Sequence, residues 1–145
     1  MDTDREDLAA TVSELHQLLG QLMRRMRAAH EGAALTLSQA AVLYRLVSEG
    51  PHTPAALARA ERVRPQSMGA TLGALEEQGL VARGPHPTDG RQVVMTPTEA
   101  GSRLLEEIRS AKEGWLLDAI ATRLDPDEQR TLIASVALLR RLVES

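Results

Sequence analysis

A proline-rich hairpin with an arginine at its tip is the feature of this sequence best suited to chemistry. Residues 80–83 and 89–96 form the one convincing pair of strands in a sequence otherwise patterned for helices, and residues 84–88 connect them. Arg91 follows an Asp-Gly dipeptide, which is a favoured hairpin turn. A narrow minor groove focuses the negative potential of DNA, and arginine side chains enter it readily. The hairpin therefore predicts contact with duplex DNA.

The residues before this hairpin predict a helix-turn-helix. Thr53-Pro54 supplies an N-cap and a proline in the first helical position, and the helix that follows ends near Arg59. Residues 61–64 turn the chain around Val63, which we expect to be buried, and Pro65 opens the second helix. Two short helices joined by a tight turn make this motif, whose second helix enters a major groove.

The second helix separates an apolar face from a sparse polar one. At 100° per residue, the inward positions are Met68, Leu72 and Leu75, and the outward positions are Gln66, Ala70, Gly73 and Glu77. The residues at its N-terminal end that can meet base edges or phosphates are Arg64, Gln66 and Ser67. Glutamine pairs with adenine, and arginine with guanine or a phosphate. A surface charge at Arg64 and a first-turn hydroxyl at Ser67 are about equally good interpretations.

The N-terminal segment, roughly Arg5 to Ala29, carries a heptad seam. Its apolar positions are Leu8, Val12, Leu15, Leu19, Leu22 and Met26. A lone helix cannot hide such a stripe, so either other parts of the chain or a partner chain must cover it. The arginines of this helix form a basic cluster that we interpret as a solvated face: Arg24, Arg25 and Arg27.

The C-terminal third predicts two further helices. Thr96 caps the first, Pro97 takes its first position, and the helix runs to Leu124. Its apolar stripe consists of Leu104, Ile108, Ala111 and Trp115. Asp125-Pro126 opens the last helix, whose stripe consists of Leu132, Val136, Leu139 and Val143. Ser38 is expected to cap a further helix, in front of the helix-turn-helix, that continues to Val47.

Composition excludes several classes of function. The 145 residues suit one domain, and the absence of cysteine removes disulfides, thiolate catalysis and zinc fingers. The sequence contains no nucleophile–base pair, phosphate-binding glycine loop or metal-ligand spacing, so we expect neither an enzyme nor a cofactor or metal. No run of 18 apolar residues occurs, and the acidic start predicts a cytoplasmic protein. The net charge is −3, but residues 51–96 carry five arginines against four acids.

Four sequence pieces together resemble the MarR family of bacterial transcriptional regulators. They are residues 35–39, residues 75–83, Asp89-Gly90-Arg91 and residues 95–101. The resemblance implies a mainly α fold with a small β-hairpin wing, a winged helix-turn-helix. It also implies a single domain in which residues 1–34 and 98–145 form dimerisation helices and residues 35–97 bind DNA. A homodimer would place two winged heads on a palindromic operator.

The resemblance also implies roles for individual residues. Arg91 is the wing residue expected in the minor groove, and Asp89 is expected to brace the wing, commonly through an ion pair with an arginine. A solvated Asp-Gly turn is the alternative for both. Gly69 and Ala70 stand where the family often has polar readers. Such a face lets a DNA backbone approach closely, and Ala70 can touch a thymine methyl group.

We therefore predict a sequence-specific double-stranded DNA-binding regulator, a repressor acting as a homodimer on a pseudo-palindromic operator. Release by a small aromatic or anionic effector stays open, with Trp115 as the candidate for lining its cavity. A lone tryptophan on a helical stripe also suits a core or an interface. The alternative function is a winged-helix module that binds protein, which the acidic net charge and the sparse face at Gly69, Ala70 and Gly73 would suit.

Overall fold

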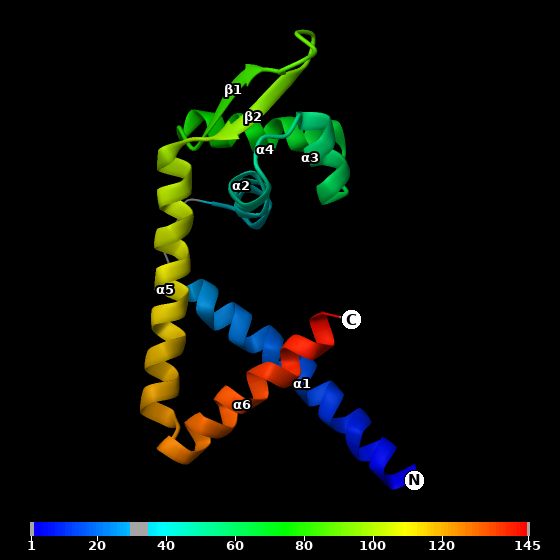
Figure 1. The fold of residues 1–145 in the computed structure, drawn as a ribbon, viewed down its shortest axis with the longest axis vertical. Helices are drawn as coiled ribbons and strands as arrows, with labels where there is room; N and C mark the ends of the chain where they lie inside the picture. Colours follow the sequence, from blue (N-terminus) through cyan, green and yellow to red (C-terminus); the bar gives the residue numbers. More distant parts are fainter. Residues whose placement is uncertain (1, 30–34, 145) are drawn as a thin grey trace. The chain divides into compact units, whose positions relative to one another are not determined.

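The computed structural model describes residues 2–29 and 35–144, which fold into helices and one two-stranded hairpin (Figure 1). In chain order the elements are α1 (Asp2–Ala28), α2 (Leu37–Glu49), α3 (Pro54–Glu61), α4 (Pro65–Glu77), β1 (Val81–Pro85), β2 (Val93–Pro97), α5 (Glu99–Arg123) and α6 (Pro126–Val143). The predicted fold class, mainly α with a small β-hairpin wing, is confirmed.

The chain divides into two compact units. The winged unit is Gly32–Arg109, and the end-helix unit combines Met1–Glu31 with Ser110–Ser145. Helix α5 begins in the winged unit and ends in the end-helix unit. This division separates the helix-turn-helix and hairpin from the heptad-patterned ends of the chain.

Local capping signals determine where several helices begin. Thr53 Oγ1 accepts the N–H of Ala56 at 3.1 Å, with Pro54 in the first turn of α3. Asp125 and Glu128 form a reciprocal capping box at the start of α6. Pro65 opens α4. These three helix starts agree with the predictions from sequence.

Two predicted caps are wrong. Thr36, not Ser38, caps α2, because Thr36 and Gln39 exchange side-chain and backbone hydrogen bonds at 3.1 Å each. Thr96 and Pro97 do not open α5, because both continue β2. Thr98 caps α5 instead: its Oγ1 accepts the N–H of Gly101 at 3.1 Å.

The hydrophobic core lies entirely in the winged unit. Its buried side chains are Val42, Leu43, Leu46, Leu57, Ala58, Met68, Leu72, Leu75, Leu80, Val81 and Met95. The three residues that helical periodicity turns inward on α4 are among them. The prediction of a buried Val63 is wrong, since its side chain is 41% exposed. It follows Arg62, whose φ of 55° makes the turn, and it lines a surface groove with Leu37 and Met68.

The hairpin is held to the helices at its base. The β1 and β2 strands pair antiparallel from Val81↔Pro97 to Pro85↔Val93, and His52 adds a bridge to Met95. At the start of α5, the N–H of Thr98 donates to the Leu80 carbonyl at 3.0 Å. A Cβ on Gly101 would lie 2.2 Å from the same oxygen, so only glycine permits this approach. In Figure 1 the hairpin tip extends past the helices of this unit.

The end-helix unit has no buried side chain among its described residues. Large apolar side chains of α1 and α6 are exposed, among them Leu8, Val12, Met23, Ile133, Leu138, Leu142 and Val143. Among the described residues, no helix is both long enough and apolar enough to cross a membrane. The helices of this unit therefore expose apolar side chains of the kind that a hydrophobic core would bury.

Candidate nucleic-acid interface

Helix α4 begins without a side-chain cap. Arg64 occupies the N-cap position in an extended conformation, and its side chain accepts no hydrogen bond from the first turn. By contrast, side chains of Thr36, Thr53 and Asp125 cap α2, α3 and α6. The N–H groups of a helix's first turn need acceptors, and the partial positive charge there attracts anions. The start of α4 can therefore offer backbone donors to a phosphate.

The outward face of α4 is small and open. Arg64, Gln66, Ser67, Gly69 and Ala70 are all exposed, and Arg64 makes no ion pair within the described ranges. A Cβ built on Gly69 would meet no atom within 4 Å. Packing within the described chain therefore does not require this glycine, although it weakens the helix by about 1 kcal/mol relative to alanine.

Gly73 differs from the other predicted surface positions of α4, because it is half-buried. A Cβ there would also meet no atom within 4 Å. The sequence-predicted face is therefore most open over the first two turns of α4.

Asp89 fixes the tip of the hairpin through its carboxylate. Its Oδ1 accepts the backbone N–H of Arg91 at 3.1 Å, and its Oδ2 accepts Gln92 Nε2 at 3.4 Å. The ion pair with an arginine side chain that the resemblance implied for Asp89 is not found among the described residues. Asp89 instead braces the turn through a backbone bond, as aspartates in turns do. Arg91 is exposed, with no described acidic partner.

Arg83 joins the hairpin to α4, a contact that the sequence analysis missed. Its Nε and Nη2 lie 2.8 and 2.7 Å from Glu76 Oε1. The hydrogen bond that Arg83 donates to Glu76, followed by the attraction of the two charges, raises the pKa of Arg83. With Arg59 and Gln92, Arg83 also lines a groove of about 540 Å³ beside the start of α3. The opposite charges at positions 76 and 83 were the only signal in the sequence.

A second ion pair joins α2 to α3. Arg45 Nε lies 2.7 Å from Glu61 Oε1, and Arg45 Nη1 lies 3.0 Å from Glu49 Oε1. The hydrogen bond to Glu61 is the main cause that raises the pKa of Arg45. The pair holds the helix that precedes α4 against the body of the winged unit.

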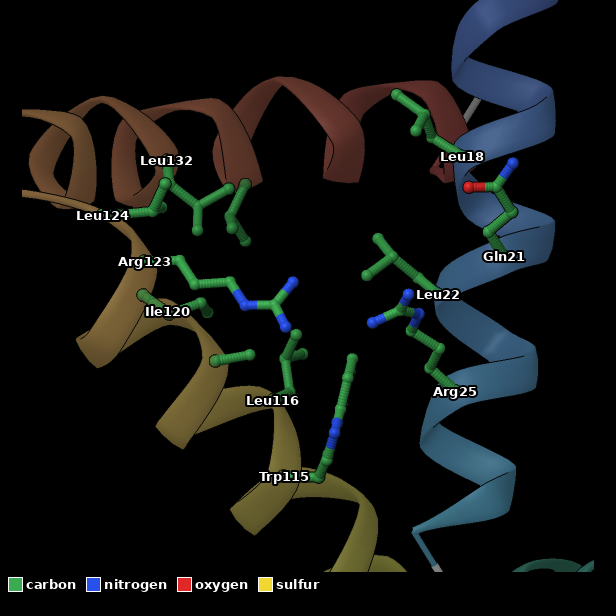
Figure 2. A pocket seen from close by; sticks show the side chains of 12 residues that line it. Leu18, Gln21, Leu22, Arg25, Trp115, Leu116, Ile120, Arg123, Leu124 and Leu132 are labelled. Carbon is green, nitrogen blue, oxygen red and sulfur yellow. The ribbon is translucent and has the colours of Figure 1, made fainter.

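Trp115 lies in an open apolar groove of the end-helix unit, with a volume of about 540 Å³. Most of the lining is aliphatic, from α1, α5 and α6. Figure 2 shows the guanidinium groups of Arg25, from α1, and Arg123, from α5, pointing into this groove near Trp115. The described residues contain no group of three or more His, Cys, Asp or Glu side chains that could hold a metal ion.

Comparison with known proteins gives consistent relatives. Residues 35–93 match the model of the MarR family. The chain is 38% identical to the HTH-type transcriptional regulator MT0903.1 of Mycobacterium tuberculosis, and the match covers 94% of each chain. The crystal structure of a transcriptional regulator from Pseudomonas aeruginosa is 32% identical, covers 97% of each chain and has a TM-score of 0.84. A mutant of Escherichia coli MarR, 24% identical with a TM-score of 0.71, covers 90% of this chain and 94% of its own and shares the fold.

Proposed function

The chain belongs to the MarR family of transcriptional regulators, and we propose that it is a homodimeric repressor of a pseudo-palindromic operator. As a family member it is a DNA-binding regulator and not an enzyme. The observation that carries the finer proposal is the pairing of two open basic elements in one unit. These are the start of α4, which lacks a side-chain cap, and the hairpin, whose tip carries Arg91.

The two elements suit different grooves of a duplex. We assign Arg64, Gln66 and Ser67 to base edges and phosphates of the major groove, because they are exposed at the N-terminal end of α4. Gly69 and Ala70 allow close approach, and Arg91 enters the adjacent minor groove while Asp89 braces its turn. The Arg83–Glu76 contact keeps the two elements in one orientation.

The exposed apolar surface of the end-helix unit supports a homodimer. Soluble monomers rarely expose contiguous apolar patches of more than a few hundred Å². Leu142 and Val143 of α6 are 70% and 84% exposed, and most of the α1 seam is exposed as well, at Leu8, Val12, Leu19 and Leu22. A second copy of the same helices offers a matching apolar face, because a two-fold interface uses the same patch twice. Two heads then address two half-sites, in the cytoplasm where bacterial DNA lies.

We further propose the Trp115 groove as the place where a small amphipathic anion acts as effector. Its aliphatic lining suits an apolar ring, and Arg25 and Arg123 supply positive charge. A thermal-shift screen of organic anions, repeated with operator present, tests this role. An effector stabilises the free protein and loses that effect with DNA bound, whereas a ligand of no regulatory consequence stabilises both states equally.

The DNA-binding proposal is tested by gel shift with the DNA upstream of the chain's own gene. We expect a specific complex at submicromolar protein whose affinity falls steeply with salt, because phosphate contacts release counterions. The alternative, a winged-helix module that binds protein, predicts no specific shift and a partner whose binding is insensitive to salt. That outcome would refute the operator-binding proposal and favour a protein partner.

A further inference from the structure

The ring of His86 lies inside the turn at the hairpin tip and accepts hydrogen bonds from its backbone. His86 Nδ1 lies 3.2 Å from the N–H of Thr88 and 3.1 Å from the N–H of Asp89. The hydroxyl of Thr88 lies 3.3 Å from the same nitrogen. His86 is half-buried, although the turn around it is mostly exposed. One side-chain atom therefore gathers two consecutive backbone donors of the wing tip.

The rest of the turn is connected to this cluster. The N–H of His86 donates to the Gln92 carbonyl at 3.2 Å, and the N–H of Gln92 donates to the Asp89 carbonyl at 3.1 Å. Asp89, whose N–H bonds to the imidazole, in turn accepts the N–H of Arg91. The path from His86 to Arg91 thus consists of two hydrogen bonds that share Asp89.

The geometry assigns a tautomer to His86. An imidazole nitrogen accepts backbone N–H groups only while it carries no proton, so the proton of the neutral ring lies on Nε2. Asparagine and aspartate usually supply such an acceptor in turns, because their side-chain oxygen reaches the N–H groups two and three residues ahead. Nδ1 of histidine is the same number of bonds from Cα as that oxygen. His86 can therefore do the work of an asparagine at this position.

We propose that His86 is a positioning residue for DNA binding: its Nδ1 orders the turn of residues 86–92 so that Arg91 is held ready for the minor groove. The proposal rests on the DNA-binding function proposed above. An ordered turn lowers the entropy lost when a loop binds, so its effect is on affinity more than on the stability of the core. Pro85 and Pro87 restrict the backbone on either side and act in the same direction.

The first test uses the full chain without DNA. In the neutral ring of wild-type protein, ¹⁵N NMR should find His86 Nδ1 without a proton and Nε2 with one. Amide exchange at Thr88 and Asp89 should be slower in the native chain and in His86→Asn than in His86→Ala. A proton on Nδ1, or equal exchange in all three proteins, would overturn the assignment of His86 as the acceptor.

The second test measures operator affinity in native and Arg91→Ala backgrounds. We expect His86→Ala to weaken binding about five- to tenfold, which corresponds to the free energy of one hydrogen bond. His86→Asn should stay within about twofold of the native affinity, because its side-chain oxygen can still accept the backbone N–H groups. Thr88→Ala, which keeps both backbone bonds, is the matched control and should bind as the native chain does. In the Arg91→Ala background, His86→Ala should have no further effect, because its action passes through Arg91.

The outcomes separate this inference from the proposed function. Failure of the native chain to bind any operator DNA would refute the DNA-binding proposal and this role with it. If the native chain binds but His86→Ala binds equally well, or His86→Asn fails to rescue, the role of His86 alone is wrong. Additive losses for His86→Ala and Arg91→Ala would mean that His86 does not act through Arg91.

Discussion

Arg83 of β1 holds Glu76 of α4 through two of its nitrogens, so the hairpin and the recognition helix are joined side chain to side chain. Nε and Nη2 of Arg83 lie 2.8 and 2.7 Å from the same carboxylate oxygen. The pair adds to the core packing between α4 and β1, and we expect it to help keep the angle between the two elements. A duplex can be read by α4 and the hairpin together only if that angle is kept.

Breaking the Arg83–Glu76 pair should reduce operator affinity while leaving stability nearly unchanged. The side chain of Arg83 is 51% exposed, and exposed pairs contribute at most about 1 kcal/mol to stability. We expect Arg83→Glu to bind weakly and the double variant Glu76→Arg/Arg83→Glu, which has the native net charge, to recover much of the loss. Arg103→Ala, which breaks the exposed pair with Glu99, is the control. A double variant no better than Arg83→Glu would show that the pair does not orient the hairpin, because that variant restores both an opposite-charge pair and the native net charge.

Arg91→Ala should weaken operator binding several-fold or more without changing the fold. The guanidinium is exposed and unpaired among the described residues, so its loss removes a DNA contact and no packing. The slope of log affinity against log salt concentration should become less steep by about 1, which is the change expected when one cationic side chain near the phosphates is removed. Arg91→Lys should retain part of the affinity because it retains the charge. Equal affinity and slope for Arg91→Ala would remove this residue from the interface.

Gly69→Ala should make the protein more stable and a poorer DNA binder. Alanine favours the helix by about 1 kcal/mol, and the added Cβ meets no atom of the described chain. The methyl group would, however, occupy space that a DNA backbone needs at the start of α4. Thermal unfolding and gel shift on the same preparation measure the two effects. A stabilised variant with native affinity would mean that DNA does not approach this face closely.

Gly101→Ala should destabilise the winged unit by about 3 kcal/mol, near the upper end for overpacked sites, because neither partner can move cheaply. The new Cβ would lie 2.2 Å from the Leu80 carbonyl oxygen and 3.1 Å from Leu43 Cδ1. Gly84→Ala, where a Cβ meets nothing within 4 Å, is the matched control and should be near neutral. Chemical denaturation of both variants tests the contact. A native-like Gly101→Ala would mean that α5 does not start this close to the hairpin.

Short-range patterns predicted most of the fold. Thr53-Pro54, Pro65 and Asp125-Pro126 each combine a cap or a proline with the start of a helix, so the sequence alone locates α3, α4 and α6. Near α2, two hydroxyl residues compete, and the reciprocal bond with Gln39 decides for Thr36. Pro97 misled the prediction for α5, because a proline that suits a helix start also suits the end of an edge strand.

The contacts that orient the candidate site could not be predicted in the same way. Glu76 and Arg83 meet only because α4 and β1 pack against each other after a turn through Gly79, whose φ is 71°. The acceptor role of His86 depends on how the wing tip folds back on its own side chain. By contrast, the exposed positions of α4 followed directly from helical periodicity, which needs no tertiary information.

The proposed dimer can be tested by substituting exposed apolar side chains of the end-helix unit. Leu142 of α6 is 70% exposed, and a charge there should oppose association with a second copy. We expect Leu142→Glu to separate the dimer and to lose operator affinity, because a single head makes half the contacts. Arg141→Glu is the matched control and should remain dimeric, because helical periodicity turns Arg141 away from the apolar stripe of Leu132, Val136 and Leu139.

The mass of the complex with an operator duplex, measured by light scattering, tests the whole account most directly. Two copies of the 15.8 kDa chain per duplex, already paired before DNA is added, is the predicted result. Leu142→Glu should give the mass of one chain and no stable complex. A native chain that stays at 15.8 kDa at working concentrations, or binds the duplex as a single copy, would contradict the account.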